Sequence, residues 1–505
     1  MKIEEMIAAN RADCSGCEAC ANICPKNAIT MTRDAEGFAY PKINPELCIK
    51  CGRCDATCPS LNFIKKDIEA FPETFAATYP DEKILRRSSS GGTFTALSEI
   101  ILKSGGVVFG AGFDKNFRVV HTSAKNLDEL ENLRGSKYVQ SQIGDVYRQV
   151  RDALKSTSVL FCGTSCQCAG LKHFLGKDFD NLLTVAIICH GVPSPALWEN
   201  YIAELGYAHE IKHVNFRSKR NGWGGSNIEI NFADRGYYFK TFSKDLYGKV
   251  FYKGISERPS CHSCKFKFPN ILSDLTLGDA WGIQKFAPEM YDKRGVSLVI
   301  VHTPKGKRFL EETNLKMQSV KFIDAASNNN HIVSASIADS RREKFFSDLA
   351  QNEDKFAVLQ EYYDQDDEEI RKGTGKKKRD IFQKNIRDLA AQIRRHFTKN
   401  ILVMSSPHSK GEQKILENFL EQDFKDCGVY ILQPKEDDQF VCTETFSLLT
   451  TDLKDAKAIS AFVRKYNITE IYIENMLKFG DSSSQIINRL KTFDVPVKFF
   501  NLDRE

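Results

Sequence analysis

The sequence lacks any long apolar run and carries little net charge, and both absences limit what the protein can be. None of its 505 residues lies in a stretch of about 18 uninterrupted apolar residues, the length that a membrane-spanning helix needs. The N-terminal segment MKIEEMIAAN has neither the basic nor the apolar region of a signal peptide. A formal net charge of +5 is too small to indicate nucleic acid as a partner. We therefore expect a cytoplasmic protein without a transmembrane segment.

Cysteine, in contrast, is abundant. The chain has 16 cysteines, and in a reducing compartment such a number indicates metal ligation or redox chemistry rather than disulfides. Eight of them fall in two copies of one pattern, CSGCEACANICP at 14–25 and CIKCGRCDATCP at 48–59. In this C-x2-C-x2-C-x3-C-P pattern the first three thiolates bind one [4Fe–4S] cluster and the fourth binds the other.

The repeat therefore predicts a two-cluster ferredoxin domain over residues 1–65, with crossed ligand sets. The first cluster takes Cys14, Cys17, Cys20 and Cys58; the second takes Cys48, Cys51, Cys54 and Cys24. Zinc, the alternative, would be satisfied by two C-x2-C pairs and would leave four thiols without a role. The segment resembles bacterial two-cluster ferredoxins, in which each cluster carries one electron.

After Phe71, short apolar runs alternate with amphipathic stretches, which is typical of an α/β fold. We expect buried strands at 75–79, 106–113, 158–163 and 182–191. Between the first two, apolar residues at helical spacing precede Gly105 and Gly106, which suit a helix end. The pattern predicts an α/β core over residues 70–345.

Two short segments of this core have the composition of phosphate-binding loops. The first, RRSSSGGT, ends in Ser90, Gly91, Gly92 and Thr93 directly before the predicted helix. Free N–H groups at a helix N-terminus suit a phosphate, whereas the alternative is a serine N-cap followed by a turn. The second, RGSKYVQS, contains Gly135, Ser136, Lys137 and Tyr138, and its alternative is a solvated turn.

Four more cysteines fall at predicted strand ends or in adjacent loops. They are Cys166, Cys189, Cys261 and Cys264, and four thiolates complete one tetrahedral site. Spacing alone leaves open a separate zinc at the C-x2-C pair, or buried inert thiols. Cys162 and Cys168 are close enough in sequence to replace Cys166 in such a site.

Several ordered stretches resemble the family of coenzyme F420 hydrogenase/dehydrogenase beta subunits. They are SSSGGTFTAL, GGVVFGAGFD, RGSKYVQSQIG, VLFCGTSCQCAGLK, ICHGVPSP, FRSKRNGWGG, CHSCKF and SDLTLGDAWGI, and with the ferredoxin motif they cover roughly residues 10–340. The resemblance implies an α/β flavoprotein with FAD and a [4Fe–4S] cluster in its core. It implies that Cys166, Cys189, Cys261 and Cys264 hold this third cluster, and that the two loops described above contact the flavin.

The chain departs from this family at one position. The family usually reads G-T-P-C-Q, whereas Ser165 stands before Cys166 in this sequence. Because proline would fix the backbone angle of the loop, we expect the thiol of Cys166 to be held more loosely than in other members.

The resemblance implies a flavin-dependent iron–sulfur oxidoreductase. A hydride carrier gives up two electrons together, but a [4Fe–4S] cluster accepts one, so a flavin must stand between them. We expect electrons to pass from coenzyme F420 or another organic substrate through FAD and the core cluster to the N-terminal clusters and a ferredoxin-like partner, or in reverse. The alternative is a non-catalytic iron–sulfur adaptor subunit of a larger redox or polysaccharide-modifying complex.

Catalytic side chains are harder to name, because the cofactor carries the chemistry. His190 and Asp279 are candidates for proton handling, with structural hydrogen bonding as the alternative for each. Trp223 and Trp281 are candidates for the wall of the hydride-carrier pocket, with core packing as their alternative.

The last third of the sequence specifies no chemistry. We expect a charged linker and an amphipathic helix over 346–397; the apolar face of this helix would pack on a neighbour, with a membrane surface as the alternative. Strand patterns at 400–405, 429–433, 470–475 and 497–501 alternate with helical ones and predict a small α/β domain over 398–505, whose role is unknown.

Overall fold

The structure, a computed structural model, describes residues 2–66, 71–206, 209–234 and 236–364, together with six strands between 400 and 500. The chain forms two compact units. The first consists of Met1–Lys66 and Pro72–Phe382, and the second of Asp67–Phe71 and Gln383–Glu505. Among the described residues, no helix has both the length and the apolar character that crossing a membrane requires.

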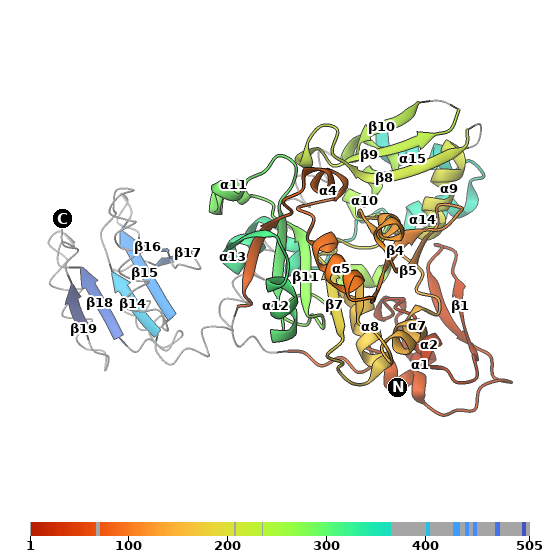
Figure 1. The fold of residues 1–505 in the computed structure, drawn as a ribbon, viewed down its shortest axis with the longest axis horizontal. Helices are drawn as coiled ribbons and strands as arrows, with labels where there is room; N and C mark the ends of the chain where they lie inside the picture. Colours follow the sequence, from red (N-terminus) through yellow and green to blue (C-terminus); the bar gives the residue numbers. More distant parts are fainter. Residues whose placement is uncertain are drawn as a thin grey trace. The chain divides into compact units, whose positions relative to one another are not determined.

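The first unit is built on a mixed eight-stranded sheet with the strand order β13-β3-β12-β11-β7-β6-β4-β5 (Figure 1). The strands are β3 (Thr74–Thr78), β4 (Val107–Phe113), β5 (Val119–Ala124), β6 (Val159–Thr164), β7 (Leu182–Ile187), β11 (Leu275–Asp279), β12 (Ser297–Val301) and β13 (Lys316–Ser319). The central strands β11, β7, β6 and β4 are parallel, and the outer pairs are antiparallel. The four strands that the apolar runs predict are confirmed as β3, β4, β6 and β7.

Helices cover both faces of this sheet. One face carries α5 (Thr93–Lys103), α6 (Leu127–Leu133) and α12 (Pro304–Glu311); the other carries α7 (Val146–Ala153) and α8 (Ser165–Leu175). Within β4, Val108 packs with the first group, whereas Val107 and Phe109 pack with the second. Both sets of alternating side chains are therefore buried, which explains why the strand reads as one continuous apolar run. The predicted end of α5 at Gly105 is confirmed, with φ +75° at that glycine.

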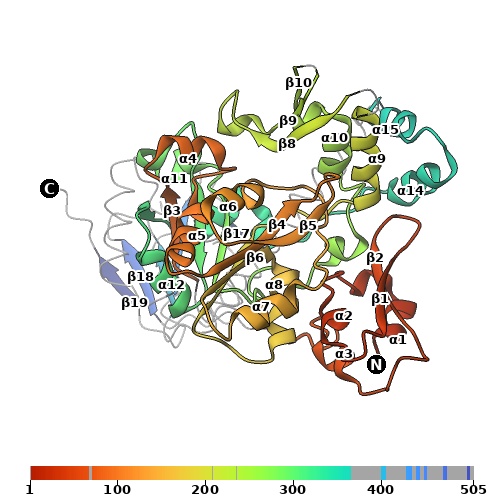
Figure 2. The same cartoon turned by 45° about the vertical axis from the view of Figure 1, so that its right-hand side comes forward.

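The N-terminal segment, residues 2–66, is called the N-terminal module below. It contains α1 (Ile3–Ala9), α2 (Ala19–Ile23), α3 (Arg53–Thr57) and the antiparallel hairpin of β1 (Ile29–Arg33) and β2 (Ala39–Ile43). Its helices α2 and α3 lie beside α8, as Figure 2 shows. The module is thus packed against α8, a helix that covers one face of the central sheet.

A second core, rich in aromatic side chains, joins the module to the rest of the unit. Phe38 and Tyr40 of the module pack there with Trp198 and Phe216. The core also receives side chains from α9 (Pro195–Leu205), α10 (Leu246–Lys253) and an antiparallel sheet of β8 (Ile211–Ser218), β9 (Asn227–Phe232) and β10 (Tyr237–Thr241). The shorter helices are α4 (Glu82–Arg87), α11 (Ile283–Phe286) and α13 (Phe322–Asn328).

Two helices occupy the start of the segment that we expected to be a charged linker. They are α14 (Arg342–Gln351) and α15 (Lys355–Asp364). Phe346, Leu349 and Leu359 are buried in the aromatic core, so their apolar burial holds this part of the chain against the first unit. The rest of the expected linker and the amphipathic helix, residues 365–397, lie outside the described residues.

The second unit contains a six-stranded sheet with the order β17-β16-β15-β14-β18-β19. Its strands are β14 (Asn400–Met404), β15 (Gly428–Pro434), β16 (Phe440–Thr443), β17 (Leu448–Thr451), β18 (Glu470–Glu474) and β19 (Val497–Phe500). Strands β15, β14, β18 and β19 are parallel and coincide with the four predicted ones. The antiparallel strands β16 and β17 were not expected.

Candidate functional site

The two cysteine motifs fold into matching turns. Glu18 and Gly52, each two residues before the third cysteine of its motif, have left-handed φ angles of 61° and 69° and begin α2 and α3. Each helix ends at the fourth cysteine, which is extended (ψ 115° and 116°) as expected before a proline. The repeat in the sequence is therefore also a repeat in backbone conformation.

Thiols from both motifs meet at one cavity in the module. Cys14, Cys17, Cys20 and Cys58 all line it. Burial raises the pKa of Cys20 well above its ordinary value, and the thiols of Cys17, Cys14 and Cys58 raise it further. Within the described ranges, no three His, Cys, Asp or Glu side chains are grouped to hold a single metal ion.

The second predicted set lies closer to solvent. Cys51 is exposed, and it is flanked by the exposed side chains of Leu47 and Ile49. Burial, then Asp55 and more weakly Cys48, raises the pKa of Cys54. The Ala28 N–H donates to Cys24 Sγ at 3.2 Å. The grouping of Cys24 with the other three thiols stays a prediction.

The four core cysteines come from separate elements but line a single cavity. Cys166 lies in the first turn of α8, Cys189 follows β7, and Cys261 and Cys264 lie in and directly after the 3-10 helix Pro259–Ser263. Burial is the main cause that raises the pKa of Cys166 to about 11 and of Cys189 to about 12, and neighbouring thiols add to it. Thiolate ligation by a positively charged iron centre would offset this cost.

The structure distinguishes Cys166 from its two sequence neighbours. Cys168 is fully buried among apolar side chains and donates to the Val185 carbonyl at 3.6 Å. Cys162 points from β6 toward a different cavity, which is described below. Only Cys166 of the three lines the cavity that Cys189, Cys261 and Cys264 share.

Ser165 lies at a capped helix start, and the looser placement expected for the Cys166 thiol stays a prediction. Ser165 begins α8, and Thr164 caps the helix through a reciprocal pair of hydrogen bonds with Gln167. Thr164 Oγ1 also lies 3.1 Å from Cys166 Sγ. A capped helix start therefore stands in place of the proline.

The thiols of the module and those of the core are neighbours. Asp13, Ser15 and Ser60 of the module line the core-cysteine cavity. On α8, a Cβ placed on Gly170 would stand 3.1 Å from Cys17 Sγ. Because Gly170 has no side chain, α8 packs closely against Cys17 of the module.

A larger cavity of about 470 Å³ lies beside the core cysteines, within the range usual for ligand pockets. The predicted flavin contacts Ser90, Gly92, Thr93, Gly135, Ser136, Lys137 and Tyr138 line it. Gly91 does not. Its N–H donates to Ser297 Oγ at 2.8 Å, and a Cβ there would approach the Ala77 carbonyl to 2.2 Å. Gly91 therefore serves close packing against the sheet, not the free N–H group that we expected.

Helix α5 begins at the wall of this cavity. Its N-cap is Gly92 in a left-handed conformation, φ 86°, so the serine N-cap that we considered is wrong. No side chain caps the helix, and its first-turn N–H groups have no partners within the helix. Thr93 Oγ1 is buried and has no hydrogen-bond partner. An anionic group of a ligand, such as a phosphate, would satisfy these donors.

The second predicted loop is joined to the first. Ser136 N–H donates to Ser89 Oγ at 2.8 Å. Lys137 Nζ donates to the carbonyls of Asn132 and Arg134 at 2.7 and 2.9 Å. Burial lowers the pKa of Lys137 to about 7. This loop is not a solvated turn, because its lysine is enclosed in the cavity wall.

The half-buried Lys137 predicts a pH-dependent difference in stability. In the unfolded chain a lysine keeps its proton up to about pH 10.4, whereas folded Lys137 releases it near pH 7. The unfolded state therefore binds more protons between these values, and the free energy of unfolding contributed by Lys137 rises with pH. We expect the ligand-free Lys137→Met variant to be more stable than the wild type, and the difference to be larger at pH 6 than at pH 9. Urea denaturation at both pH values measures this difference.

The matched control is Lys115→Met at an exposed lysine. Its difference in urea midpoint from the wild type should stay constant from pH 6 to pH 9. A constant difference for Lys137→Met as well would contradict the prediction.

Asp279 lines the same cavity with its carboxylate fully engaged. It accepts hydrogen bonds from Arg217 Nη1 at 2.9 Å and from Trp223 Nε1 at 2.6 Å. Trp281 lines the cavity, stacked on Trp223 at 4.8 Å between ring centroids, and Trp223 is buried behind it. These hydrogen bonds hold the Asp279 carboxylate in place, and its part in proton handling stays a prediction. Trp281 is the tryptophan at the pocket wall.

His190 lies where the two cavities meet and lines both. Its Nδ1 is 2.7 Å from Nε2 of His331, and its Nε2 is 3.3 Å from a carboxylate oxygen of Glu257. Arg258, next to Glu257, contacts Cys14 of the module through both the carbonyl and the sulfur of that residue. No motif singled out Arg258, whose only signal in the sequence is its place three residues before Cys261.

Three family models match this chain. Residues 13–62 match the 4Fe-4S dicluster domain. Residues 74–148 match the N-terminal part of "Coenzyme F420 hydrogenase/dehydrogenase, beta subunit", and residues 156–325 match its C-terminal part. The matched segments contain all of the cysteines that line the cavities described above.

Individual relatives are distant. The chain is 22% identical to a subunit of F(420)H(2) dehydrogenase in Methanosarcina mazei over 325 residues, which are 60% of this chain and 83% of that relative. It is 37% identical to VorC, a subunit of ketoisovalerate oxidoreductase in Methanothermobacter marburgensis, over 62 residues, 12% of this chain and 78% of the relative. A solved F420-reducing [NiFe] hydrogenase complex from Methanosarcina barkeri includes a chain with TM-score 0.38 and 16% identity, covering 58% of this chain and 98% of that one.

Proposed function

This chain belongs to the family of coenzyme F420 hydrogenase/dehydrogenase beta subunits and carries a 4Fe-4S dicluster domain, and from this we propose that it is an iron–sulfur flavoprotein oxidoreductase. Its FAD would exchange a hydride with coenzyme F420 or another organic substrate. Its clusters would exchange electrons with a ferredoxin-like partner. The iron–sulfur module follows from the match to the 4Fe-4S dicluster domain. The flavin, the third cluster and the ferredoxin-like partner are what we propose.

One observation carries the proposal: the two core cavities share a wall. Residues 187–192, together with Thr164 and His331, line both the cavity of the four core thiols and the larger cavity at the start of α5. Cys189 is part of this wall. A cluster ligand would therefore stand directly beside a bound flavin.

The residues at the larger cavity fit FAD. The first turn of α5, the unpartnered hydroxyl of Thr93 and the half-buried Lys137 would hold its anionic groups. A bound flavin would supply the conversion between hydride and single-electron transfer. On the other wall, Trp281 presents a flat surface, and its position is fixed by stacking on Trp223.

The thiols fit a chain of clusters that leads away from this wall. Cys189 lines the larger cavity, in which the flavin is proposed to bind. Burial raises the pKa of the Cys17 thiol, and Cys166 is close enough to raise it further. Cys51, which belongs to the second module set, is exposed. We propose that the partner docks at the exposed set, where Leu47 and Ile49 are also exposed. Electrons would then pass through the protein interior between the larger cavity, which ligands reach, and the second module set, which solvent reaches.

The test is anaerobic reconstitution of the full chain with iron, sulfide and FAD. We expect bound flavin, about twelve irons per chain and bleaching of the flavin absorbance by a reduced hydride donor, screened over reduced F420, NADH and NADPH. Reduced-cluster signals in electron paramagnetic resonance should appear with the bleaching. Clusters that assemble without any flavin would instead support the non-catalytic adaptor.

A further inference from the structure

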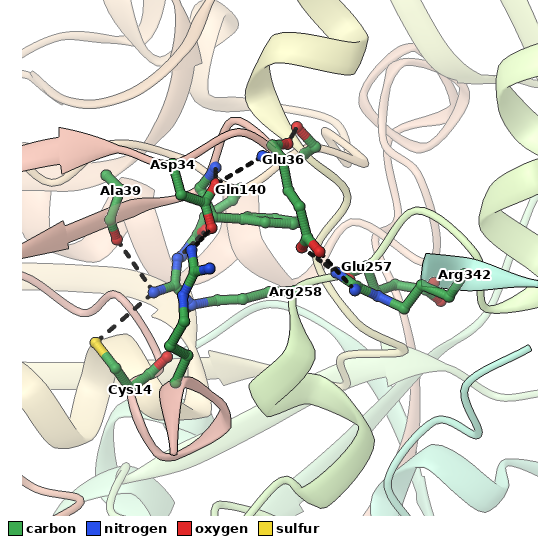
Figure 3. Close-up of polar contacts among 11 residues, drawn as sticks. Cys14, Asp34, Glu36, Ala39, Gln140, Glu257, Arg258 and Arg342 are labelled. Carbon is green, nitrogen blue, oxygen red and sulfur yellow. Dashed lines mark hydrogen bonds and ion pairs between the residues drawn. The ribbon is translucent and has the colours of Figure 1, made fainter. Parts of the chain in front are cut away.

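Arg258 is a fully buried arginine at the boundary between the N-terminal module and the core (Figure 3). Its Nε donates to the Cys14 carbonyl at 2.8 Å, and its Nη2 donates to the Ala39 carbonyl at 3.1 Å. Its Nη1 donates to Gln140 Oε1 at 3.1 Å. The guanidinium also lies 4.1 Å from the ring centroid of Tyr40. One core side chain thus holds several parts of the module.

Among the residues that the structure describes, no carboxylate forms an ion pair with Arg258. All of the hydrogen-bond acceptors above are neutral groups. The two carboxylate oxygens of the nearby Glu18 instead accept the N–H groups of Ile143 and Gly144, each at 3.0 Å. A buried cation without an ion-pair partner is costly, because burial removes its hydration. The protein would keep such a charge where a negative group compensates it when the protein is complete.

The thiols next to Arg258 indicate which negative group this is. Arg258 Nη2 donates to Cys14 Sγ at 3.7 Å. The guanidinium therefore reaches a thiol of the first module set. A [4Fe–4S] cluster with four thiolates is an anion, and reduction makes it more negative.

We propose that Arg258 is a positioning residue that sets the reduction potential of the cluster ligated by Cys14. A cation and an N–H donor at a ligand sulfur stabilise the reduced cluster more than the oxidised one, because the reduced cluster carries more negative charge. Arg258 thereby raises the potential of this cluster and favours electron transfer between it and the core. The inference rests on the iron–sulfur part of the proposed function and needs no flavin.

Arg342 provides a matched control at the same boundary (Figure 3). It is also buried, and it makes a bidentate ion pair with Glu36 of the module at 3.0 and 2.6 Å. Its Nε donates to the Glu257 carbonyl at 3.0 Å. Arg342 therefore ties the module to the core, as Arg258 does, but its charge is neutralised by a carboxylate.

The experiment is a potentiometric titration of the reconstituted full chain, followed by electron paramagnetic resonance. In Arg258→Gln, we expect one cluster midpoint to fall by at least about 59 mV, a tenfold change in the equilibrium constant of a one-electron couple. Arg258→Lys keeps the charge and should shift the midpoint by less than half as much. Arg342→Gln should leave every midpoint unchanged.

Gln140→Glu tests the same charge without removing the arginine. A carboxylate at this position would pair with Nη1 of Arg258 and neutralise it, so the same midpoint should fall. This variant decides the question if Arg258→Gln does not fold. Unchanged midpoints in an iron-replete Arg258→Gln or Gln140→Glu protein, or an equal shift in Arg342→Gln, would overturn the proposal. Protein with clusters but without flavin would refute the proposed function and leave this inference intact.

Discussion

Replacing Cys166 with alanine should remove about four of about twelve irons per reconstituted chain. The reason is that the thiols of Cys166 and of three other half-buried cysteines line one cavity although they come from distant parts of the sequence. Without one ligand, a cube in this cavity loses its full coordination. Iron and flavin should be quantified on the same sample, and reduction of the module clusters by the hydride donor should be lost while chemical reduction by dithionite persists.

The control for this prediction is Cys168→Ala. Cys168 lies two residues further along α8, is fully buried whereas Cys166 is half-buried, and lines neither cavity. This variant should retain the full iron content and hydride-driven cluster reduction, with a moderate loss of stability from the smaller side chain. Equal iron loss in both variants, or full iron content in Cys166→Ala, would show that Cys166 is not a cluster ligand.

Thr93→Val should weaken flavin binding without destabilising the ligand-free protein. Its hydroxyl is buried and has no partner in the structure, so the isosteric valine removes an unsatisfied polar group. A hydrogen bond to a charged phosphate contributes about 1.5–3 kcal/mol, and its loss should raise the Kd for FAD by roughly ten- to a hundredfold. Titration of the ligand-free protein with FAD gives the Kd, and urea denaturation gives the stability.

Thr184→Val should show the opposite pair of effects. Thr184 is also fully buried, but its hydroxyl donates to Asp274 Oδ2 at 2.7 Å, and Thr184 lies outside the larger cavity, in which we propose that the flavin binds. Removing this bond should lower stability by about 1–3 kcal/mol and leave the Kd for FAD unchanged. Strong FAD binding by Thr93→Val would mean that the phosphate lies elsewhere.

Local patterns in the sequence predicted those parts of the fold whose physical causes are local. The runs that became β4 and β6 are apolar on both faces because helices cover both sides of the sheet. The eight module cysteines recur at a fixed spacing, because each motif folds into the same short turn and helix. The antiparallel strands β16 and β17 of the second unit were not predicted, although β19, which has the same length of four residues, was.

The convergence of distant residues was beyond the reach of local patterns. Spacing could not decide between Cys166 and Cys168, because the choice depends on which face of α8 points to Cys189. Gly91 and Gly92 look equivalent in the sequence, but one packs on Ser297 and the other caps a helix. Arg258 was overlooked because its role depends on the module, more than two hundred residues earlier in the chain.

The aromatic core has a consequence for how fast electrons can move. Phe38 and Tyr40 of the module are buried among side chains such as Trp198 and Phe345, and they belong to the same core as α10 and α15. A carrier on a flexible tether must swing between donor and acceptor, and solvent viscosity slows that motion. Here the spacing between the module thiols and the core thiols is set by packing, so intramolecular electron transfer should proceed at the same rate in buffer and in concentrated glycerol.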